Sequence, residues 1–391
     1  MAQYIDILRI VYYNIFNILR IAKGYFCGNK KSIMANYFNE RDKAVTQRLR
    51  EIRDTLPELC EEFFIGIEPQ TTALTRLNYA YDLRIFFDYL LNNVRAFKNY
   101  TDILDFQIED LSKFTVLNLE AYMEYLSLYE YDDREYTNGN KGKARKISTV
   151  RTFFKYYFNR DRIPSNVAAK LTMPKQHDKE IIRLEAHEVE MILNVAENGE
   201  GMSEHQRKIL LNTRKRDVAI LTLLLGTGIR VSECVGLNLT DIDFETNAFT
   251  VTRKGGNRAI LYFGDEVAEA LLEYIESERK ALINRSVKLE MGDTDALFLS
   301  LQIRRISVRA VENLVKKYAA CAAPLKKISP HKLRSTFGTN LYKATSDIYM
   351  VADVLGHRDV NTTKKHYAAI EEDHRKIAAK VVKLRDNKDE D

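Results

Sequence analysis

The sequence predicts a mainly α-helical protein in two domains, with one small β-sheet or hairpin in its C-terminal half. Apolar residues recur at helical spacing through most of the 391-residue chain, and 247–263 alternates as strands do. A segment bracketed by Pro164 and Pro174 interrupts the helical pattern and indicates an interdomain linker. We expect a helical extension of unknown function at 1–57, a helical domain at 58–170, a linker at 171–183, a second domain at 184–385 and a disordered tail at 386–391.

Composition excludes several classes of protein. The formal net charge of +5 is too small to identify a partner by itself. The cysteines form no C-x-x-C pair, which argues against a zinc site and a disulfide framework and favours reduced thiols in a cytoplasmic protein. They are Cys27, Cys60, Cys234 and Cys321.

The first segment, 4–26, is rich in large apolar residues but is interrupted by Asp6, Arg9 and Arg20. It therefore lacks the roughly 20 apolar residues of a membrane span, and it has no signal-peptide features. We predict no membrane association and assign no role to 1–35. Whether Met34 is the true start stays open.

The helical domain is predicted to contain a long helix beginning at Thr71–Thr72 and a second helix that carries Leu117 to Leu126. A polar loop at 132–142 and a third helix over 146–159 follow. The junction of this loop with the third helix is basic. It is either a solvated helix face or a surface that contacts the phosphate backbone of DNA. The candidate DNA-binding residues are Lys141, Lys143, Arg145, Lys146, Arg151 and Lys155.

In the second domain, an apolar helix over 214–225 breaks at the sequence G-T-G-I-R-V-S-E, and Arg230 stands where the next helix begins. A buried arginine needs a partner. Either Glu233 is the structural counter-ion of Arg230, or the Arg230 guanidinium faces an incoming phosphate. Lys254 lies in the glycine-containing turn between two predicted strands. Lys254 is either an exposed residue of the turn or a residue that comes close to a bound ligand.

The stretch from Ser329 to Tyr367 organises the chemistry. Pro330 suits the first turn of a helix, on which His331 and Arg334 project from one face. His357 follows in L-G-H, and Tyr367 follows in K-K-H-Y. Each residue alone is commonly structural. Together, two imidazoles, a guanidinium and a phenol suit a phosphate oxyanion, with the phenol as the nucleophile.

These residues, in this order, resemble the tyrosine recombinases, which include phage integrases and Xer-type resolvases. The resemblance covers about 184–384 through its motifs and extends more loosely over the helical domain. It implies a two-domain C-clamp architecture, with a SAM-like core-binding domain before a mixed α/β catalytic domain. It also implies site-specific exchange of DNA strands through a 3′-phosphotyrosyl intermediate and a Holliday junction.

The resemblance assigns the catalytic roles. Tyr367 would attack the phosphodiester, and Arg230 and Arg334 would clamp its oxygens. His331 and His357 would add hydrogen bonds, Lys254 would protonate the departing 5′-oxygen, and Glu233 would hold Arg230. No metal and no other cofactor is expected, because cationic side chains supply the charge stabilisation.

The implied partners are double-stranded DNA and three further copies of the chain, in a homotetramer formed through a C-terminal helix at 375–384. Two other functions remain open. One is a type IB-like DNA topoisomerase, and the other is a non-catalytic DNA-binding protein on the same fold. The sequence separates neither chromosome-dimer resolution from integration and excision of a mobile element, nor one target site from another.

Overall fold

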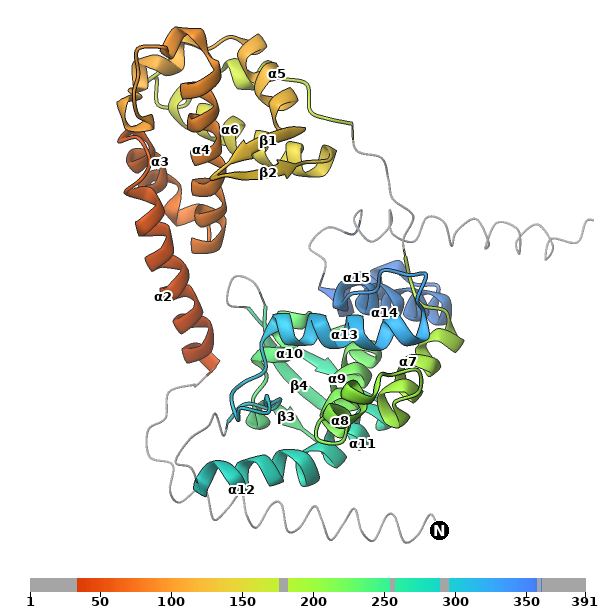
Figure 1. The fold of residues 1–391 in the computed structure, drawn as a ribbon. Coiled ribbons are helices and arrows are strands. Elements are labelled where there is room, and N and C mark those ends of the chain that lie inside the picture. Colours follow the sequence, from red (N-terminus) through yellow and green to blue (C-terminus); the bar gives the residue numbers. More distant parts are fainter. Residues whose placement is uncertain (1–33, 176–181, 254–256, 289–294, 357–359, 361–391) are drawn as a thin grey trace, which may run out of the picture. The chain divides into compact units, whose positions relative to one another are not determined.

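The computed structural model describes residues 34–175, 182–253, 257–288, 295–356 and 360. They form two compact units, the helical unit from Ala35 to Lys179 and the C-terminal unit from Glu180 onward. Both consist mainly of helices, and the strands form one two-stranded and one three-stranded antiparallel sheet (Figure 1). The predicted mainly α fold with two domains is confirmed. Among the described residues, no helix has the length and apolar character to cross a membrane.

The helical unit is a set of α-helices linked by short 3-10 turns and one hairpin. Its elements are α2 (Met34–Arg53), α3 (Leu59–Ile67), η1 (Glu68–Gln70), α4 (Ala73–Asn93), η2 (Arg95–Phe97), η3 (Ile103–Asp105), η4 (Ile108–Lys113), α5 (Val116–Tyr125), β1 (Leu128–Tyr131), β2 (Arg134–Thr137), α6 (Asn140–Phe158) and η5 (Val167–Lys170).

Aromatic rings form the core of the helical unit. The rings of Phe63 and Phe153 meet edge-to-face with centroids 5.0 Å apart, and those of Phe86 and Tyr122 do so at 5.1 Å. Such pairs add to the free energy of burial because the ring quadrupoles are complementary. Leu49 from α2 is buried in the same core. Apolar packing thus begins before residue 58, inside the segment that the sequence suggested was an extension.

The β1–β2 hairpin occupies part of the segment for which we expected a polar loop. Its turn residues, Asp132 and Asp133, have φ of 54° and 55°, as a tight hairpin turn requires. Tyr129 pairs with Tyr136 across the strands, and their rings stack with centroids 5.4 Å apart. Aspartate tolerates this left-handed backbone, so the prediction of an irregular loop over 132–142 is corrected to a hairpin followed by α6.

The C-terminal unit combines helices with a short sheet in the order β3-β4-β5. Its elements are α7 (Ala186–Asn198), α8 (Glu204–Leu210), α9 (Arg214–Thr227), α10 (Val231–Gly236), η6 (Leu239–Asp241), β3 (Ile242–Asp243), β4 (Ala248–Thr252), β5 (Arg258–Tyr262), α11 (Asp265–Tyr274), η7 (a π-helical turn, Ile275–Arg279), α12 (Lys280–Lys288), α13 (Val308–Ala322), α14 (Pro330–Thr345) and α15 (Ile348–Leu355).

Helix α9 lies at the centre of the C-terminal unit and contacts α7, α11, α13 and α14 (Figure 1). The run from Ala219 to Leu224 is buried throughout. A helix that is apolar on all sides is stable only where other elements surround it. The C-terminal end of α9 is therefore fixed in the interior, and the residues that follow it are held in a defined place.

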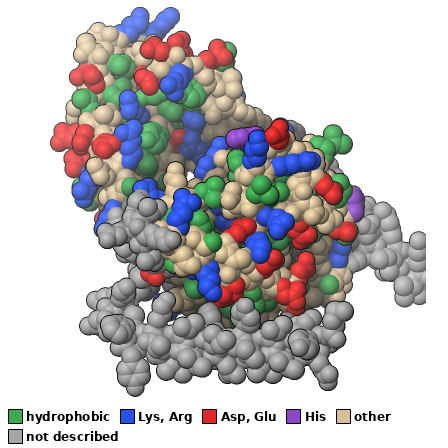
Figure 2. Space-filling model, turned by 60° about the horizontal axis from the view of Figure 1, so that its bottom comes forward, with side chains coloured by type: hydrophobic (Ala, Val, Ile, Leu, Met, Phe, Trp, Pro, Cys, Tyr) green, Lys and Arg blue, Asp and Glu red, His purple; other side chains and the backbone are tan. Residues whose placement is uncertain are grey.

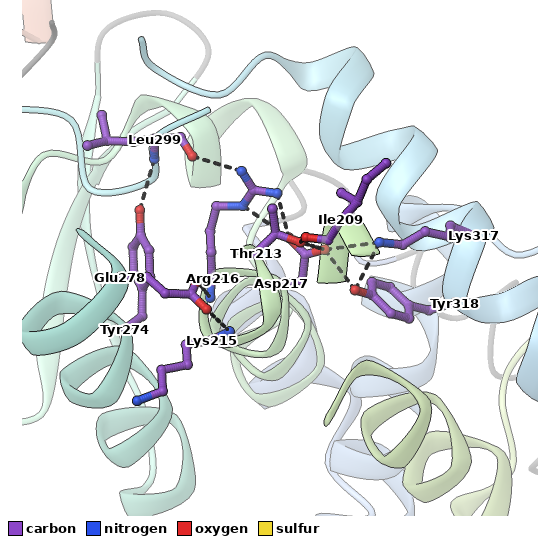
Figure 3. Close-up of polar contacts among 10 residues, drawn as sticks. All are labelled: Ile209, Thr213, Lys215, Arg216, Asp217, Tyr274, Glu278, Leu299, Lys317 and Tyr318. Carbon is purple, nitrogen blue, oxygen red and sulfur yellow. Dashed lines mark hydrogen bonds and ion pairs between the residues drawn. The ribbon is translucent and has the colours of Figure 1, made fainter. Parts of the chain in front are cut away.

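Polar side chains fix the N-terminal end of α9 (Figure 3). The Glu278 carboxylate accepts hydrogen bonds from the backbone N–H groups of Lys215, at 2.9 Å, and Arg216, at 3.0 Å. These are first-turn N–H groups, which lack partners within their own helix. The π-helical turn η7 supplies the Glu278 side chain and so ties the segment after α11 to the start of α9.

Asp217, in the first turn of α9, is buried and is the centre of a second group of contacts in Figure 3. Its carboxylate accepts hydrogen bonds from Tyr318 Oη at 2.7 Å, Lys317 Nζ at 3.1 Å and Arg216 Nη2 at 2.7 Å. Burial, followed by the negative charge of Asp217, raises the pKa of Tyr318 well above its ordinary value. The phenol is therefore a permanent donor that joins α13 to α9.

Candidate active site

The first candidate residue, Arg230, is placed by the break between α9 and α10. Gly228 ends α9 with φ of 61°, and Arg230 is the residue that immediately precedes α10. A Cβ on Gly228 would lie 2.4 Å from Phe337 Cδ1. Glycine is required here both by the left-handed backbone and by the close approach of α14. The G-T-G-I-R sequence thus turns the chain so that Arg230 follows directly.

Glu233 is the counter-ion of Arg230, one of the two roles that the sequence allowed. Its carboxylate accepts from the Arg230 backbone N–H at 3.1 Å and from Arg230 Nη1 at 2.9 Å. The Glu233 side chain is 4% exposed, whereas that of Arg230 is 38% exposed. The buried carboxylate is paired, as a buried charge must be. The exposed part of the guanidinium remains accessible to solvent and to a ligand.

Arg334 is buried in α14, whose first helical residue is Pro330 as predicted. Its Nη1 donates to the carbonyl oxygen of Gly228, and its Nη2 donates to that of Leu355. These carbonyls belong to the C-terminal ends of α9 and α15. A helix C-terminus carries partial negative charge, so the two helix ends offset the cost of burying the guanidinium and fix its plane.

Arg230 and Arg334 meet at one short stretch of chain. Arg230 Nη2 donates to the carbonyl oxygen of Gly356 at 3.2 Å, next to the Leu355 carbonyl that Arg334 uses. Arg230 and Arg334 are 104 residues apart in the sequence. The structure therefore brings these two predicted residues, with Glu233, to the same place.

A third arginine, which the sequence analysis did not single out, reaches the same helix end. Arg253 follows β4, and its Nη2 donates to the carbonyl oxygen of Val354 at 3.2 Å. The carbonyls of 354, 355 and 356 thus each accept a hydrogen bond from a different guanidinium. No local pattern revealed this role, because the partner lies 101 residues away.

His331 lies on α14 with its side chain exposed, whereas Arg334 on the same helix is buried. The face of α14 that His331 and Arg334 were expected to share therefore lies partly in solvent, at His331, and partly in the interior, at Arg334. Three other candidates, Lys254, His357 and Tyr367, lie outside the described residues, as does the expected C-terminal helix at 375–384. Within the described ranges, no three His, Cys, Asp or Glu side chains are grouped to hold a metal ion.

The predicted DNA-binding residues of the helical unit occupy different environments. Lys141 and Lys155 are exposed on α6. Lys143 is partly buried and donates to Ser127 Oγ at 2.5 Å, and Arg151 is partly buried beside the Ala169 carbonyl. On the face drawn in Figure 2, basic and acidic side chains are interspersed, with no extended field of a single sign.

The side chains of Arg145 and Lys146 are bound to other residues of the helical unit. Arg145 Nη2 donates to Asp82 Oδ1 at 2.7 Å, and Asp82 is 1% exposed. Lys146 is buried, and its Nζ donates to Asn138 Oδ1 at 3.2 Å. Burial lowers the pKa of Lys146, while Asp82 opposes this shift. The expectation that Lys146 lies on the DNA-facing surface is corrected, because its side chain points into the helical unit.

Comparisons with known proteins bear on this arrangement. Residues 183–374 match the model of the phage integrase family. The tyrosine recombinase XerC of Natranaerobius thermophilus is 31% identical over 260 residues, which are 66% of this chain and 80% of that protein. XerC of Caldanaerobacter subterraneus subsp. tengcongensis is 31% identical over 318 residues, 79% of this chain and 82% of that protein.

The chain belongs to the tyrosine recombinases of the phage integrase family. Members of the family are site-specific recombinases that transfer DNA strands, so the chain is a DNA strand-transferase. Two solved tyrosine recombinase structures share its fold. The XerH recombinase, bound to its palindromic difH substrate after cleavage, has a TM-score of 0.57 at 18% identity and matches 80% of this chain and 81% of its own.

The second is the Tn1549 transposon integrase in complex with circular intermediate DNA. It has a TM-score of 0.53 at 18% identity and matches 80% of this chain and 95% of that one. At this identity the likeness concerns the fold alone. The tyrosine recombinase fold, the family and the activity class expected from the sequence are therefore confirmed, while the role of each site residue stays a prediction.

Proposed function

We propose that this tyrosine recombinase cuts and rejoins duplex DNA at specific sites through a 3′-phosphotyrosyl intermediate at Tyr367. The phenol oxygen attacks phosphorus, the bond from phosphorus to the 5′-oxygen breaks, and a 5′-hydroxyl departs. The phosphodiester energy is kept in the tyrosyl ester, so that rejoining needs no nucleotide. Two such rounds on paired sites pass through a Holliday junction.

The meeting of Arg230 and Arg334 at the end of α15 is the observation that carries the proposal. Guanidinium groups donate planar pairs of N–H bonds that match phosphate oxygens. Arg230 is partly exposed and held by buried Glu233, while Arg334 is fixed by two helix ends. In the proposed reaction, both stabilise the charge that develops on the phosphoryl oxygens in the transition state.

The other roles follow from the chemistry of each side chain. A phenol has an ordinary pKa of about 10, and a strongly cationic site favours its ionised form. His331 and His357 donate hydrogen bonds to the phosphate in this proposal, and His331 assists in removing the phenol proton. Lys254 protonates the departing 5′-oxygen. In the sequence, His357 directly follows Gly356, whose carbonyl oxygen accepts a hydrogen bond from Arg230.

Exposed basic residues of α6 extend the proposed DNA contact to the helical unit. Lys141 and Lys155 are exposed, and such side chains bind phosphates with little sequence preference and a strong dependence on salt. The XerH structure is bound to its palindromic difH substrate, and the Tn1549 integrase structure is a complex with circular intermediate DNA. We further propose a ring of four copies that join through the 375–384 segment, because a head-to-tail contact can close a ring.

Two alternatives make different predictions. A type IB-like topoisomerase forms the same tyrosyl ester but relaxes plasmid DNA without a specific site. A non-catalytic DNA-binding protein forms no ester. The sequence similarity to XerC recombinases favours strand exchange. Within recombination, both chromosome-dimer resolution and integration or excision of a mobile element fit the proposal.

Covalent trapping on DNA tests the nucleophile. Genomic DNA that becomes covalently attached to the wild-type protein is sequenced to recover its site, and that site is built into a nicked duplex from which the cleaved end diffuses away. Wild type should accumulate a protein–DNA adduct, and Tyr367→Phe should accumulate none. Tyr349→Phe is the matched control, because this phenol is exposed on α15.

Equal adduct from wild type and Tyr367→Phe would refute the assignment of the nucleophile. Absence of adduct from wild type on every recovered or genomic duplex would refute the proposed activity. Trapping spread evenly over unrelated sequences, with relaxation of supercoiled plasmid, would favour the topoisomerase.

A further inference from the structure

Arg145 and Asp82 form an ion pair of unequal exposure in the helical unit. The Arg145 side chain is 53% exposed, whereas that of Asp82 is 1% exposed. The contact is bidentate, because Arg145 Nη1 donates to Asp82 Oδ2 while Nη2 donates to Oδ1 at 2.7 Å. Such a fork fixes the plane of the guanidinium. The carboxylate uses two of the five N–H donors of a guanidinium, so the exposed edge keeps donors for a ligand.

The Asp82 carboxylate is itself held firmly between α4 and α6. Thr149, four residues after Arg145 on α6, donates from its hydroxyl to Asp82 Oδ2 at 2.8 Å. Residues four apart on a helix lie on the same face, so both α6 side chains reach one carboxylate of α4. The same two helices pack through Phe87 and Phe153, whose ring centroids are 6.0 Å apart. The core of the helical unit therefore sets the position of the guanidinium.

The candidate active site contains the same arrangement. There the partly exposed Arg230 guanidinium is held by Glu233, whose side chain is 4% exposed. In both places a buried carboxylate orients an arginine whose outer edge meets solvent. A long side chain that is already held in one place loses less conformational entropy on binding than a mobile one. Arg145, with its planar fork, is therefore better prepared to bind a phosphate than Lys141 and Lys155, which are exposed on the same helix.

We infer that Asp82 is a positioning residue for DNA binding, which holds the Arg145 guanidinium so that its outer edge binds one phosphate of the duplex backbone. This inference rests on the proposed function, which makes duplex DNA the substrate. The Asp82 side chain does not touch DNA in this role, because it is buried. The ligand is the phosphodiester backbone, so the contact anchors the protein without reading the base sequence.

The negative charge of Asp82 separates a positioning role from simple electrostatics. Removal of a carboxylate makes the protein more positive, and charge alone then favours DNA binding and steepens its dependence on salt. Loss of positioning has the opposite sign, because the guanidinium is no longer held for the phosphate and one contact is weakened. The direction in which Asp82→Asn changes the affinity therefore distinguishes the two roles.

The experiment measures the affinity of the full chain for duplex DNA over a range of salt concentrations, on the recovered site and on an unrelated sequence. Arg145→Met should weaken binding to both duplexes about tenfold and reduce the slope of log affinity against log salt by about 1. Asp82→Asn should weaken binding by at least about threefold, and it should have no further effect in the Arg145→Met variant.

Asp110→Asn is the matched control. It removes a carboxylate that is 2% exposed, close to the 1% of Asp82, and that holds Lys113 in the acidic turn η4 instead of an arginine on α6. The change in charge is the same, but no phosphate contact is lost. Asp110→Asn should therefore bind both duplexes at least as tightly as wild type.

Wild-type or tighter binding by Asp82→Asn would overturn the inference, and so would an equal loss of affinity with and without Arg145. If thermal unfolding shows that Asp82→Asn does not fold, Arg145→Lys gives the test, because it keeps the charge and loses the planar fork. It should bind more weakly than wild type, whereas Lys141→Arg should not. Equal affinity of Arg145→Lys and wild type would then overturn the inference.

Failure of the proposed function has a different signature. Wild type then forms no covalent adduct, although its affinity for the unrelated duplex and the effect of Asp82→Asn on that affinity are still measured. Wild-type protein that binds neither duplex would refute both the function and the positioning role.

Discussion

Neighbouring basic residues of α6 show how strongly burial changes what a charge can do. Lys141 is exposed, whereas Lys146 is buried beside Asn138. In the sequence both belong to one basic run without acidic residues, and they looked equivalent. Near Lys146 lies the charge of Asp82, a buried carboxylate of α4 that binds Arg145 and opposes the lowering of the Lys146 pKa by burial. A single aspartate in a helical pattern gives no sign that distant residues will surround it.

We therefore predict that Lys146→Met leaves DNA affinity unchanged and leaves the stability of the helical unit equal or higher. The lowered pKa of Lys146 has burial as its main cause, so folding disfavours the charged form at neutral pH and removal of the charge relieves that cost. Lys141→Ala should weaken DNA binding and reduce the slope of log affinity against log salt by about 1.

Salt-dependent binding to a fixed duplex and urea unfolding check both variants. Loss of affinity by Lys146→Met equal to that of Lys141→Ala would contradict the placement of Lys146 inside the unit.

At the scale of elements, local patterns predicted where helices begin and end better than they predicted which elements contact one another. Thr72 caps α4 and Pro330 opens α14 as expected, because capping depends on adjacent residues. Glu233 could be recognised as a partner of Arg230 for the same reason. The β1–β2 hairpin was missed because its Asp132–Asp133 turn also suits a polar loop. The role of Arg253 was missed because its partner carbonyl belongs to α15.

The polar group around Asp217 determines how firmly α9 is held. We predict that Asp217→Asn lowers the free energy of unfolding of the C-terminal unit by about 3 kcal/mol, because it leaves the partly buried side chains of Arg216 and Lys317 without their counter-ion. The Asp217 side chain is 2% exposed and contacts Lys317 from α13. Glu204→Gln is the control, since the Glu204 side chain is 85% exposed in its ion pair with Lys208 and should contribute less than about 1 kcal/mol.

Hydrogen exchange of α9 amides during a urea titration measures this effect locally, apart from unfolding of the helical unit. Equal changes in the two variants would mean that the buried network does not hold the helix.

At the scale of the whole molecule, the central claim is that side chains far apart in sequence form one phosphate site. Composition and periodicity predicted the fold class, and the motifs indicated the family. The convergence of Arg230 and Arg334 could be expected only through the family resemblance, since no spacing rule relates the residue before α10 to a residue in α14. The structure gives that convergence a physical basis in the ends of α9 and α15, whose carbonyls bind both guanidiniums.

A double-mutant cycle on the rate of adduct formation tests this claim most directly, with Arg230→Lys, Arg334→Lys and the double variant measured on the same nicked duplex. Residues that clamp one phosphate should be strongly coupled. Each substitution should therefore raise the activation free energy by at least about 1 kcal/mol less in the other single variant than it does in the wild-type protein. Losses that simply add, within about 0.5 kcal/mol, are expected for independent sites and would contradict a shared phosphate site.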